Sequence, residues 1–140
     1  MKRSGSTALY VLTLCTLTAP VLAEGLPDCP KSPNCVSSQA SNPERQVAPL
    51  KAGDTAAEAR QRLTAVLADL PRVNWTALSD TRIEAAFTTR ILRFTDDVIF
   101  EIGEDGLIQV RSASRVGYSD LGANRARVEM LRERLANPAQ

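Results

Sequence analysis

The sequence predicts an α+β fold: an antiparallel sheet of about four strands, two helices packed on one of its faces, and an extended N-terminal segment stapled by a disulfide. Three observations support this expectation. Apolar residues recur at helical spacing in the stretches 54–70 and 120–135. Between these stretches, strand-like segments follow one another with short connections, as in an antiparallel meander. Ahead of them lies a segment that is rich in proline and carries two close cysteines.

Residues 1–23 have the pattern of a cleaved signal peptide. Lys2 and Arg3 precede a mostly apolar stretch, and Val21, Leu22 and Ala23 have the small-residue spacing of a cleavage site. Threonines and a proline interrupt the stretch, so it is a poor permanent membrane span. We therefore expect a periplasmic or secreted protein. It would be held at a membrane only if this segment stayed uncleaved.

Residues 24–53 form the expected N-terminal segment, with five prolines and little periodicity. In an exported chain, Cys29 and Cys35 most simply form a disulfide. A redox pair and a metal site are the alternatives. Redox pairs usually have two intervening residues rather than five, and a metal site needs further ligands.

Residues 54–140 form the expected α+β domain. Its first helix begins at Asp54 or Thr55, where Thr55 and Glu58 fit a capping box, and it ends at Pro71. Strands are expected over the ranges 73–78, 82–92, 98–102 and 107–114, and residues 103–106 form a hairpin loop.

The last helix is expected to start near Asp120, a favourable N-cap, and to run to about residue 135. Asn124 falls inside its apolar stripe and needs a hydrogen-bonding partner there. It is either a buried asparagine bonded to a neighbouring loop or a residue that reaches a functional site. The residues expected in the buried stripe are Leu121, Val128, Leu131 and Leu135.

The composition excludes several kinds of chemistry. The chain has no histidine, so a Ser-His-Asp triad, a Cys-His pair and zinc held by imidazole are impossible. No phosphate-binding glycine loop or dinucleotide fingerprint is present. The formal net charge of +1 argues against nucleic-acid binding, which depends on neutralising phosphates. We expect no cofactor, no metal and no nucleic-acid partner.

The strand at 107–114 and its continuation carry two arginines on one face. Strict alternation places Arg111 and Arg115 on the face that looks away from the core, with Ser112 and Ser114 on the other face. The arginines either form a cross-strand ion-pair ladder or bind an anion such as a carboxylate, phosphate or sulfate. In such a ladder, Glu84 and Glu101 are the acidic residues that could pair with the arginines.

Asp96 and Asp97 form a second polar cluster, just after Arg93. Paired carboxylates can share a proton or bind a hard cation. Neighbouring residues in a strand point to opposite faces, so we expect this pair to form a turn before a strand that starts at Val98. An ion pair from either acid to Arg111 or Arg115 would join the two polar clusters.

Three blocks of sequence carry a family resemblance: CPKSPNCVSS at 29–38, RFTDD at 93–97 and RSASRVGYSDLGANR at 111–125. They resemble the signature blocks of the domain-of-unknown-function family 1499, over nearly the whole chain after the signal segment. The resemblance implies an exported or membrane-attached bacterial protein. It implies no established activity, cofactor or substrate.

We expect a non-catalytic binding or scaffold domain that holds an anionic small molecule or a protein partner. The alternative is a hydrolase or lyase in which Tyr118 or Asp120 acts as acid or base and arginines clamp the substrate. The enzyme is less favoured because the sequence offers no recognisable nucleophile and no tuned base. The candidate ligand-binding residues are Arg93, Arg111, Arg115, Tyr118, Asp120, Asn124 and Arg125.

Overall fold

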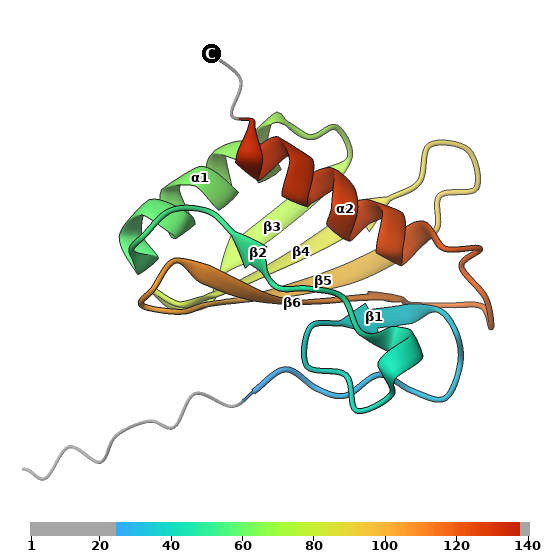
Figure 1. The fold of residues 1–140 in the computed structure, drawn as a ribbon. Helices are drawn as coiled ribbons and strands as arrows, with labels where there is room; N and C mark the ends of the chain where they lie inside the picture. Colours follow the sequence, from blue (N-terminus) through green and yellow to red (C-terminus); the bar gives the residue numbers. More distant parts are fainter. Residues whose placement is uncertain (1–24, 138–140) are drawn as a thin grey trace, which may run out of the picture.

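The computed structural model describes residues 25–137, so the expected signal segment lies outside the described residues. These described residues form six strands and two α-helices around one core (Figure 1). In order these are β1 (Cys35–Ser37), the 3₁₀ turn η1 (Pro43–Arg45), β2 (Leu50–Lys51), α1 (Ala56–Asp69), β3 (Val73–Ala77), β4 (Arg82–Thr88), β5 (Thr95–Ile102), β6 (Leu107–Ser114) and α2 (Ala123–Ala136).

The strands form one antiparallel sheet in the order β1-β6-β5-β4-β3, and β2 also pairs with β6. The predicted meander is confirmed as β3 to β6. The expected number of about four strands is wrong, because the N-terminal segment adds β1 and β2 along the outer edge of β6. Strands of three and two residues are too short to leave an alternating pattern in the sequence.

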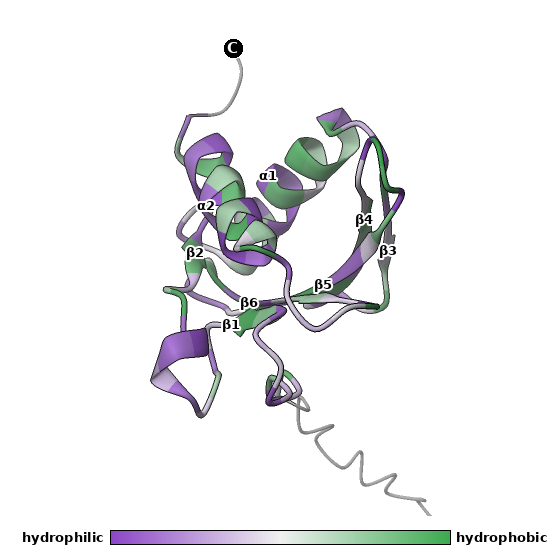
Figure 2. Cartoon of the chain, turned by 90° about the vertical axis from the view of Figure 1, so that its right-hand side faces the viewer, coloured by the Kyte–Doolittle hydropathy of each residue, from purple (hydrophilic) through white to green (hydrophobic). Residues whose placement is uncertain are grey.

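Both helices cover one face of the sheet, which curves around them (Figure 2). Along β4 and β5 every second residue is buried, so one face of each strand points into the core and the other is left open. The core is apolar and includes Leu63 and Leu67 of α1, Val128 and Leu131 of α2, and Ile83, Val98, Phe100, Ile108 and Val110 of the sheet.

The first helix follows its predicted capping. The Thr55 hydroxyl accepts a hydrogen bond from the Glu58 backbone N–H at 3.2 Å, and the Glu58 carboxylate accepts one from the Asp54 backbone N–H at 3.0 Å. The first bond satisfies an N–H group that the first turn of the helix leaves free, and the second ties the residue before the N-cap to the helix. The helix ends at Asp69, two residues before Pro71.

Two predicted strand boundaries are wrong. The strand expected to reach residue 92 ends at Thr88, because Thr89 and Phe94 pair through their backbones at 2.9 Å and close the intervening residues into a loop. The next strand begins at Thr95 rather than at Val98, so Asp96 and Asp97 lie within β5 and form no turn.

The start of the last helix is also later than predicted. The helix begins at Ala123, and Gly122 is its first flanking residue. Leu121 therefore precedes the helix and is 96% exposed, so its expected place in the buried stripe is wrong. Val128, Leu131 and Leu135 are buried as predicted.

The Cys29–Cys35 disulfide is confirmed, with the two Cα atoms 5.7 Å apart. Cys35 belongs to β1 and is fully buried, so the bond ties the start of the described chain to the edge of the sheet. Within residues 25–137, neither helix has the length and apolar character that crossing a membrane requires.

Candidate functional site

A groove of about 660 Å³ lies on the open face of the sheet, the face that the helices do not cover. The strand register builds it: Arg111 of β6 stands opposite Ile99 of β5, which stands opposite Glu84 of β4. The two arginines assigned to this face by alternation both line the groove. The polar residues around them are Asn74, Thr76, Glu84 and Asp97.

Arg115 lies at one end of this groove and is paired. Its Nε and Nη2 atoms donate to the two carboxylate oxygens of Asp97 at 2.8 and 2.7 Å. This two-point hydrogen bond and the charge of Asp97 raise the pKa of Arg115 above its ordinary value. The expected ion pair between the two polar clusters is therefore present, although both side chains remain about half exposed.

Arg111 lies deeper and has no ion-pair partner within 4 Å among the described residues. Its Nε is buried and makes no hydrogen bond there. Burial lowers the pKa of Arg111, and the negative charges of Asp28 and Asp97 offset this only in part. The open face thus holds a partly desolvated guanidinium whose buried Nε donates no hydrogen bond within the described part of the chain.

The acids expected to pair with Arg111 bind a different arginine. Arg82 donates to Glu101 at 2.6 Å and to Glu84 at 3.2 and 3.3 Å. Burial acts to lower the pKa of Arg82, but hydrogen bonds to Glu101 and Glu84 outweigh it and raise the pKa. A cross-strand ion-pair ladder is therefore present at the start of β4, and Arg111 takes no part in it.

A second arginine, Arg45, also has a buried Nε without a partner among the described residues. It lies beside a smaller hollow of about 240 Å³ at the N-terminus of α2. Arg125 in the same hollow is occupied, because it donates to the backbone carbonyls of Glu44 and Gln46 at 2.9 Å each. Arg125 therefore ties α2 to the N-terminal segment.

Asn124 is fully buried on the helix-covered side of the sheet. Its Oδ1 accepts hydrogen bonds from Ser112 at 2.6 Å and from Arg127 at 2.8 Å. Its Nδ2 donates to the Asn34 carbonyl and the Ser114 hydroxyl, each at 3.0 Å. One side chain thus connects α2, β6 and the disulfide loop, so Asn124 has the loop partner that its place in the apolar stripe required.

Asp120 orients Asn124 and the start of α2. Its carboxylate accepts the backbone N–H groups of Gly122 and Asn124 at 2.9 Å and the Asn124 amide at 2.7 Å. Partial burial acts to raise the pKa of Asp120, but these hydrogen bonds outweigh it and hold the pKa below its ordinary value. Asp120 is therefore a carboxylate fully engaged in structure.

The candidate ligand-binding residues lie in three separate parts of the structure. Arg111 and Arg115 line the groove on the open face. Asp120, Asn124 and Arg125 hold the last helix in place from other positions. Arg93 and Tyr118 lie exposed on two loops at one end of the sheet and do not line the groove.

Sequence reasoning missed one buried ion pair. Asp96 is 3% exposed and pairs with Arg127 of α2, whose guanidinium also lies 5.0 Å from the centre of the Phe87 ring. Helical periodicity could have found Arg127, which follows Asn124 by three residues and precedes Leu131 by four. No pattern indicated that Asp96 would pair with Arg127 rather than with Arg111 or Arg115, since the two residues are 31 positions apart.

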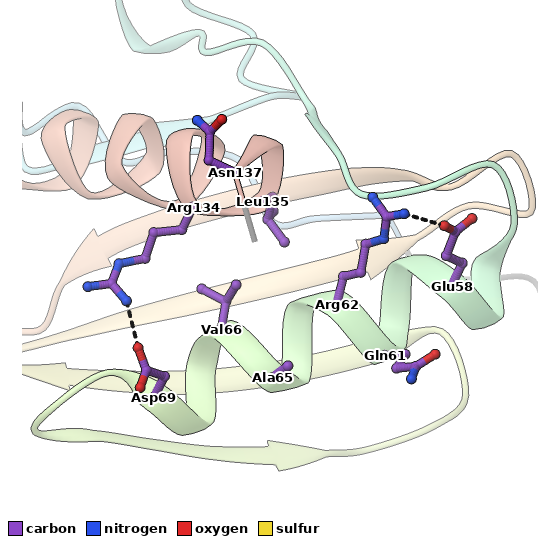
Figure 3. A pocket seen from close by; sticks show the side chains of 9 residues that line it. All are labelled: Glu58, Gln61, Arg62, Ala65, Val66, Asp69, Arg134, Leu135 and Asn137. Carbon is purple, nitrogen blue, oxygen red and sulfur yellow. Dashed lines mark hydrogen bonds and ion pairs between the residues drawn. The ribbon is translucent and has the colours of Figure 1, made fainter. Parts of the chain in front are cut away.

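A third hollow, of about 630 Å³, lies between α1 and α2 (Figure 3). Ion pairs already join the charges at its edges: Arg62 with Glu58 along α1, and Arg134 with Asp69 between the helices. This groove offers no unsatisfied charge to a ligand, in contrast to the open face. Within the described part of the chain, no three cysteine or carboxylate side chains gather as metal ligands.

The fold defines a small α+β domain in which a disulfide-bonded N-terminal segment completes the sheet and a buried asparagine network fixes the last helix. Residues 25–135 match the model of the family described as Protein of unknown function (DUF1499), and the chain belongs to this family. No curated protein matches the sequence.

Proposed function

We propose that the protein is a non-catalytic, exported binding domain whose open-face groove holds an anionic ligand through Arg111. The observation that carries this proposal is the buried Nε of Arg111, which has no partner among the described residues. A buried donor without a hydrogen bond costs about 1–3 kcal/mol, and more when it is charged. A carboxylate or phosphate bound in the groove would pair with this guanidinium, which makes no ion pair among the described residues.

The groove's other residues favour a small ligand with an apolar part. Glu84 and Asp97 also line it, so a polyanion would meet repulsion there. Asn74 and Thr76 offer neutral hydrogen bonds at one side, and Ala86 and Ile99 form an apolar surface between the charges. A single carboxylate on a short carbon skeleton fits this combination.

A binding role is favoured over the hydrolase or lyase alternative by the state of the two candidate catalytic groups. Asp120 has a lowered pKa and its carboxylate is occupied by hydrogen bonds, so it is a poor proton donor. Tyr118 is 76% exposed on a loop and does not line the groove. A general acid or base must be within hydrogen-bonding reach of its substrate.

Export is supported by two features. The Cys29–Cys35 disulfide is the kind of bond that persists in oxidising compartments. The first 23 residues have the pattern of a signal peptide. We therefore propose that the protein resides in the periplasm or outside the cell.

Native mass spectrometry of the protein recovered from its own cells tests the proposal. We expect a co-purifying small molecule in the wild type that is lost in Arg111→Met, which keeps the length of the side chain and removes its charge. Arg62→Met is the matched control, because Arg62 is an exposed arginine outside the groove. It should retain the ligand.

A titration followed by NMR gives a second readout, with succinate and inorganic phosphate as probes. We expect amide shifts centred on β5 and β6 in the wild type and none in Arg111→Met. A ligand-free wild type, together with identical titrations of the wild type and Arg111→Met, would show that Arg111 has only a structural role.

A further inference from the structure

Two loops project from the same end of the sheet. The first comprises residues 90–94, between β4 and β5, and the second comprises residues 115–122, between β6 and α2. They emerge from neighbouring strands, since Asp96 pairs with Ser114 and the Arg115 N–H donates to the Thr95 carbonyl at 3.1 Å. Figure 1 shows both at the right-hand end of the molecule. We call these two loops the loop end.

The loop end carries most of the exposed large apolar side chains. Among residues 25–137, Trp75 and Leu78 are the only exposed large apolar side chains that lie outside the loop end. The members on the loop end are Ile91 (85% exposed), Leu92 (69%), Phe94 (50%), Val116 (60%), Tyr118 (76%) and Leu121 (96%). Single exposed apolar residues are ordinary, but a cluster on adjoining loops marks an interaction surface.

Backbone strain accompanies the exposure. Leu121 and Arg93, one in each loop, have φ angles of 52° and 56°. This left-handed region is uncommon for residues other than glycine and costs of order 1 kcal/mol. At Leu121 the strained backbone holds an aliphatic side chain almost wholly in water. Neither the strain nor the exposure stabilises the unbound protein.

The uncompensated charge of the loop end is positive. Arg90 and Arg93 are exposed and make no ion pair among the described residues. The one acidic residue in either loop is Asp120, and its carboxylate is turned to the backbone at the start of α2. Free arginines therefore alternate with exposed aliphatic and aromatic side chains.

We propose that the loop end docks on the surface of an anionic lipid bilayer. Ile91, Leu92 and Leu121 enter the interface between head groups and acyl chains, while Arg90 and Arg93 bind lipid phosphates. Basic and apolar residues side by side are the composition by which peripheral proteins bind such membranes. The inference goes beyond the proposed ligand site, because it involves different residues and a different class of partner.

A bilayer is favoured over a folded protein partner by the shape of the surface. The exposed apolar side chains stand on two projecting loops, and none of these side chains lines a groove or hollow described above. Projecting apolar side chains insert into a soft interface, whereas a protein partner would need a matching cleft for each of them. The unpaired arginines match the negative surface of a membrane that contains anionic lipids.

Co-sedimentation with vesicles tests this surface. Vesicles of phosphatidylcholine with 30 mol% phosphatidylglycerol are compared with vesicles of phosphatidylcholine alone. We expect the wild type to prefer the anionic vesicles. The double variant Arg90→Gln/Arg93→Gln should lose roughly 25-fold in affinity for them, from roughly fivefold per arginine. Ile91→Ser/Leu92→Ser should lose about tenfold or more on the same vesicles.

Two control variants change the same kinds of side chain elsewhere. Leu78→Ser removes an exposed leucine at the opposite end of the sheet, and Arg62→Gln removes an exposed arginine on α1. Both should bind vesicles as the wild type does. All five proteins keep the same N-terminus, so any effect of residues 1–24 is common to them. Equal binding by the loop variants and the wild type would overturn the proposal.

A fluorescence measurement keeps the test independent of how well the loop variants fold. Leu92→Trp in a Trp75→Phe background places one tryptophan in the loop end. We expect its emission to shift to the blue when anionic vesicles are added, and brominated lipids to quench it. An unshifted emission would overturn the proposal. So would light scattering that found the wild type dimeric and Ile91→Ser/Leu92→Ser monomeric, because a second copy would then cover the surface.

Discussion

Replacing Asn124 with alanine tests whether the polar motif at the end of the sheet is a structural joint. The substitution removes every hydrogen bond of a fully buried side chain. Those bonds reach Asn34, Ser112, Ser114 and Arg127, as well as the Asp120 carboxylate. Alanine cannot replace any of them, and the surrounding polar groups stay in place.

The expected loss of unfolding free energy is about 3–5 kcal/mol. A buried polar group left unsatisfied costs about 1–3 kcal/mol. Two of the partners keep another bond, which limits the loss: the Asn34 carbonyl still accepts the Ser114 N–H at 2.9 Å, and Ser112 still meets Arg127 at 3.1 Å. The lost side-chain volume adds a cavity term. The total is a large part of the 5–15 kcal/mol typical of a domain.

Urea unfolding followed by circular dichroism measures this loss. Asn74→Ala, an exposed asparagine on β3, is the control and should stay within about 0.5 kcal/mol of the wild type. Asn124→Asp keeps the acceptor but turns an anion toward Asp120, so it should be at least as unstable as Asn124→Ala at pH 7. An Asn124→Ala protein within 1 kcal/mol of the wild type, with an unchanged dependence on urea, would refute the reasoning.

Three further predictions concern stability. Arg127→Met should cost about 3–5 kcal/mol in urea unfolding because it leaves the buried Asp96 carboxylate unpaired, and adding Asp96→Leu should recover at least half of that loss. Asp120→Asn should weaken the protein most near pH 6, and the difference from the wild type should shrink toward pH 3. The reason is that the folded-state pKa of Asp120 is lowered, so its contribution is present above about pH 4 and is lost as pH falls through that pKa. The double substitution Cys29→Ser/Cys35→Ser should lower the unfolding free energy by about 2 kcal/mol, as reduction of the wild type should.

Each of these predictions has its own check. The exposed Arg115–Asp97 pair serves as the control for the buried one, since Arg115→Met should cost no more than about 1 kcal/mol. A difference between Asp120→Asn and the wild type that did not vary with pH would mean that the carboxylate charge contributes nothing. A reducing agent that shifted the unfolding of Cys29→Ser/Cys35→Ser as much as that of the wild type would remove the disulfide as the cause.

The parts of the fold that the sequence predicted are those with long, regular patterns. The strand expected at 107–114 has the same bounds in the structure, and from Leu107 to Ser112 every second residue is buried. That alternation also placed Arg111 and Arg115 on the open face and Ser112 in the interior. The capping interaction at Thr55 could be predicted because its hydrogen bond joins residues within one helical turn.

The parts that were missed depend on contacts between distant residues. All three residues of β1 are buried, so this strand has no alternation to read, and it forms only because β6 offers a free edge. Asp96 lies in the interior because Arg127 of α2 meets it there. Leu121 has the right spacing for the helical stripe, yet the helix starts two residues after it. Periodicity cannot show where a helix begins when the cap is a loop fixed by tertiary hydrogen bonds.

The two sides of β6 separate structural from functional candidates within a single stretch of sequence. Ser112 faces α2 and is fully satisfied, whereas its neighbour Arg111 faces the open groove and lacks a partner among the described residues. A substitution at Ser112 should therefore act on stability, and one at Arg111 on binding. Arg111→Met that unfolded like the wild type but lost its ligand, beside Ser112→Ala that kept the ligand but unfolded more easily, would locate function on the open face. If both variants unfolded more easily and both kept the ligand, the whole stretch would be a structural joint.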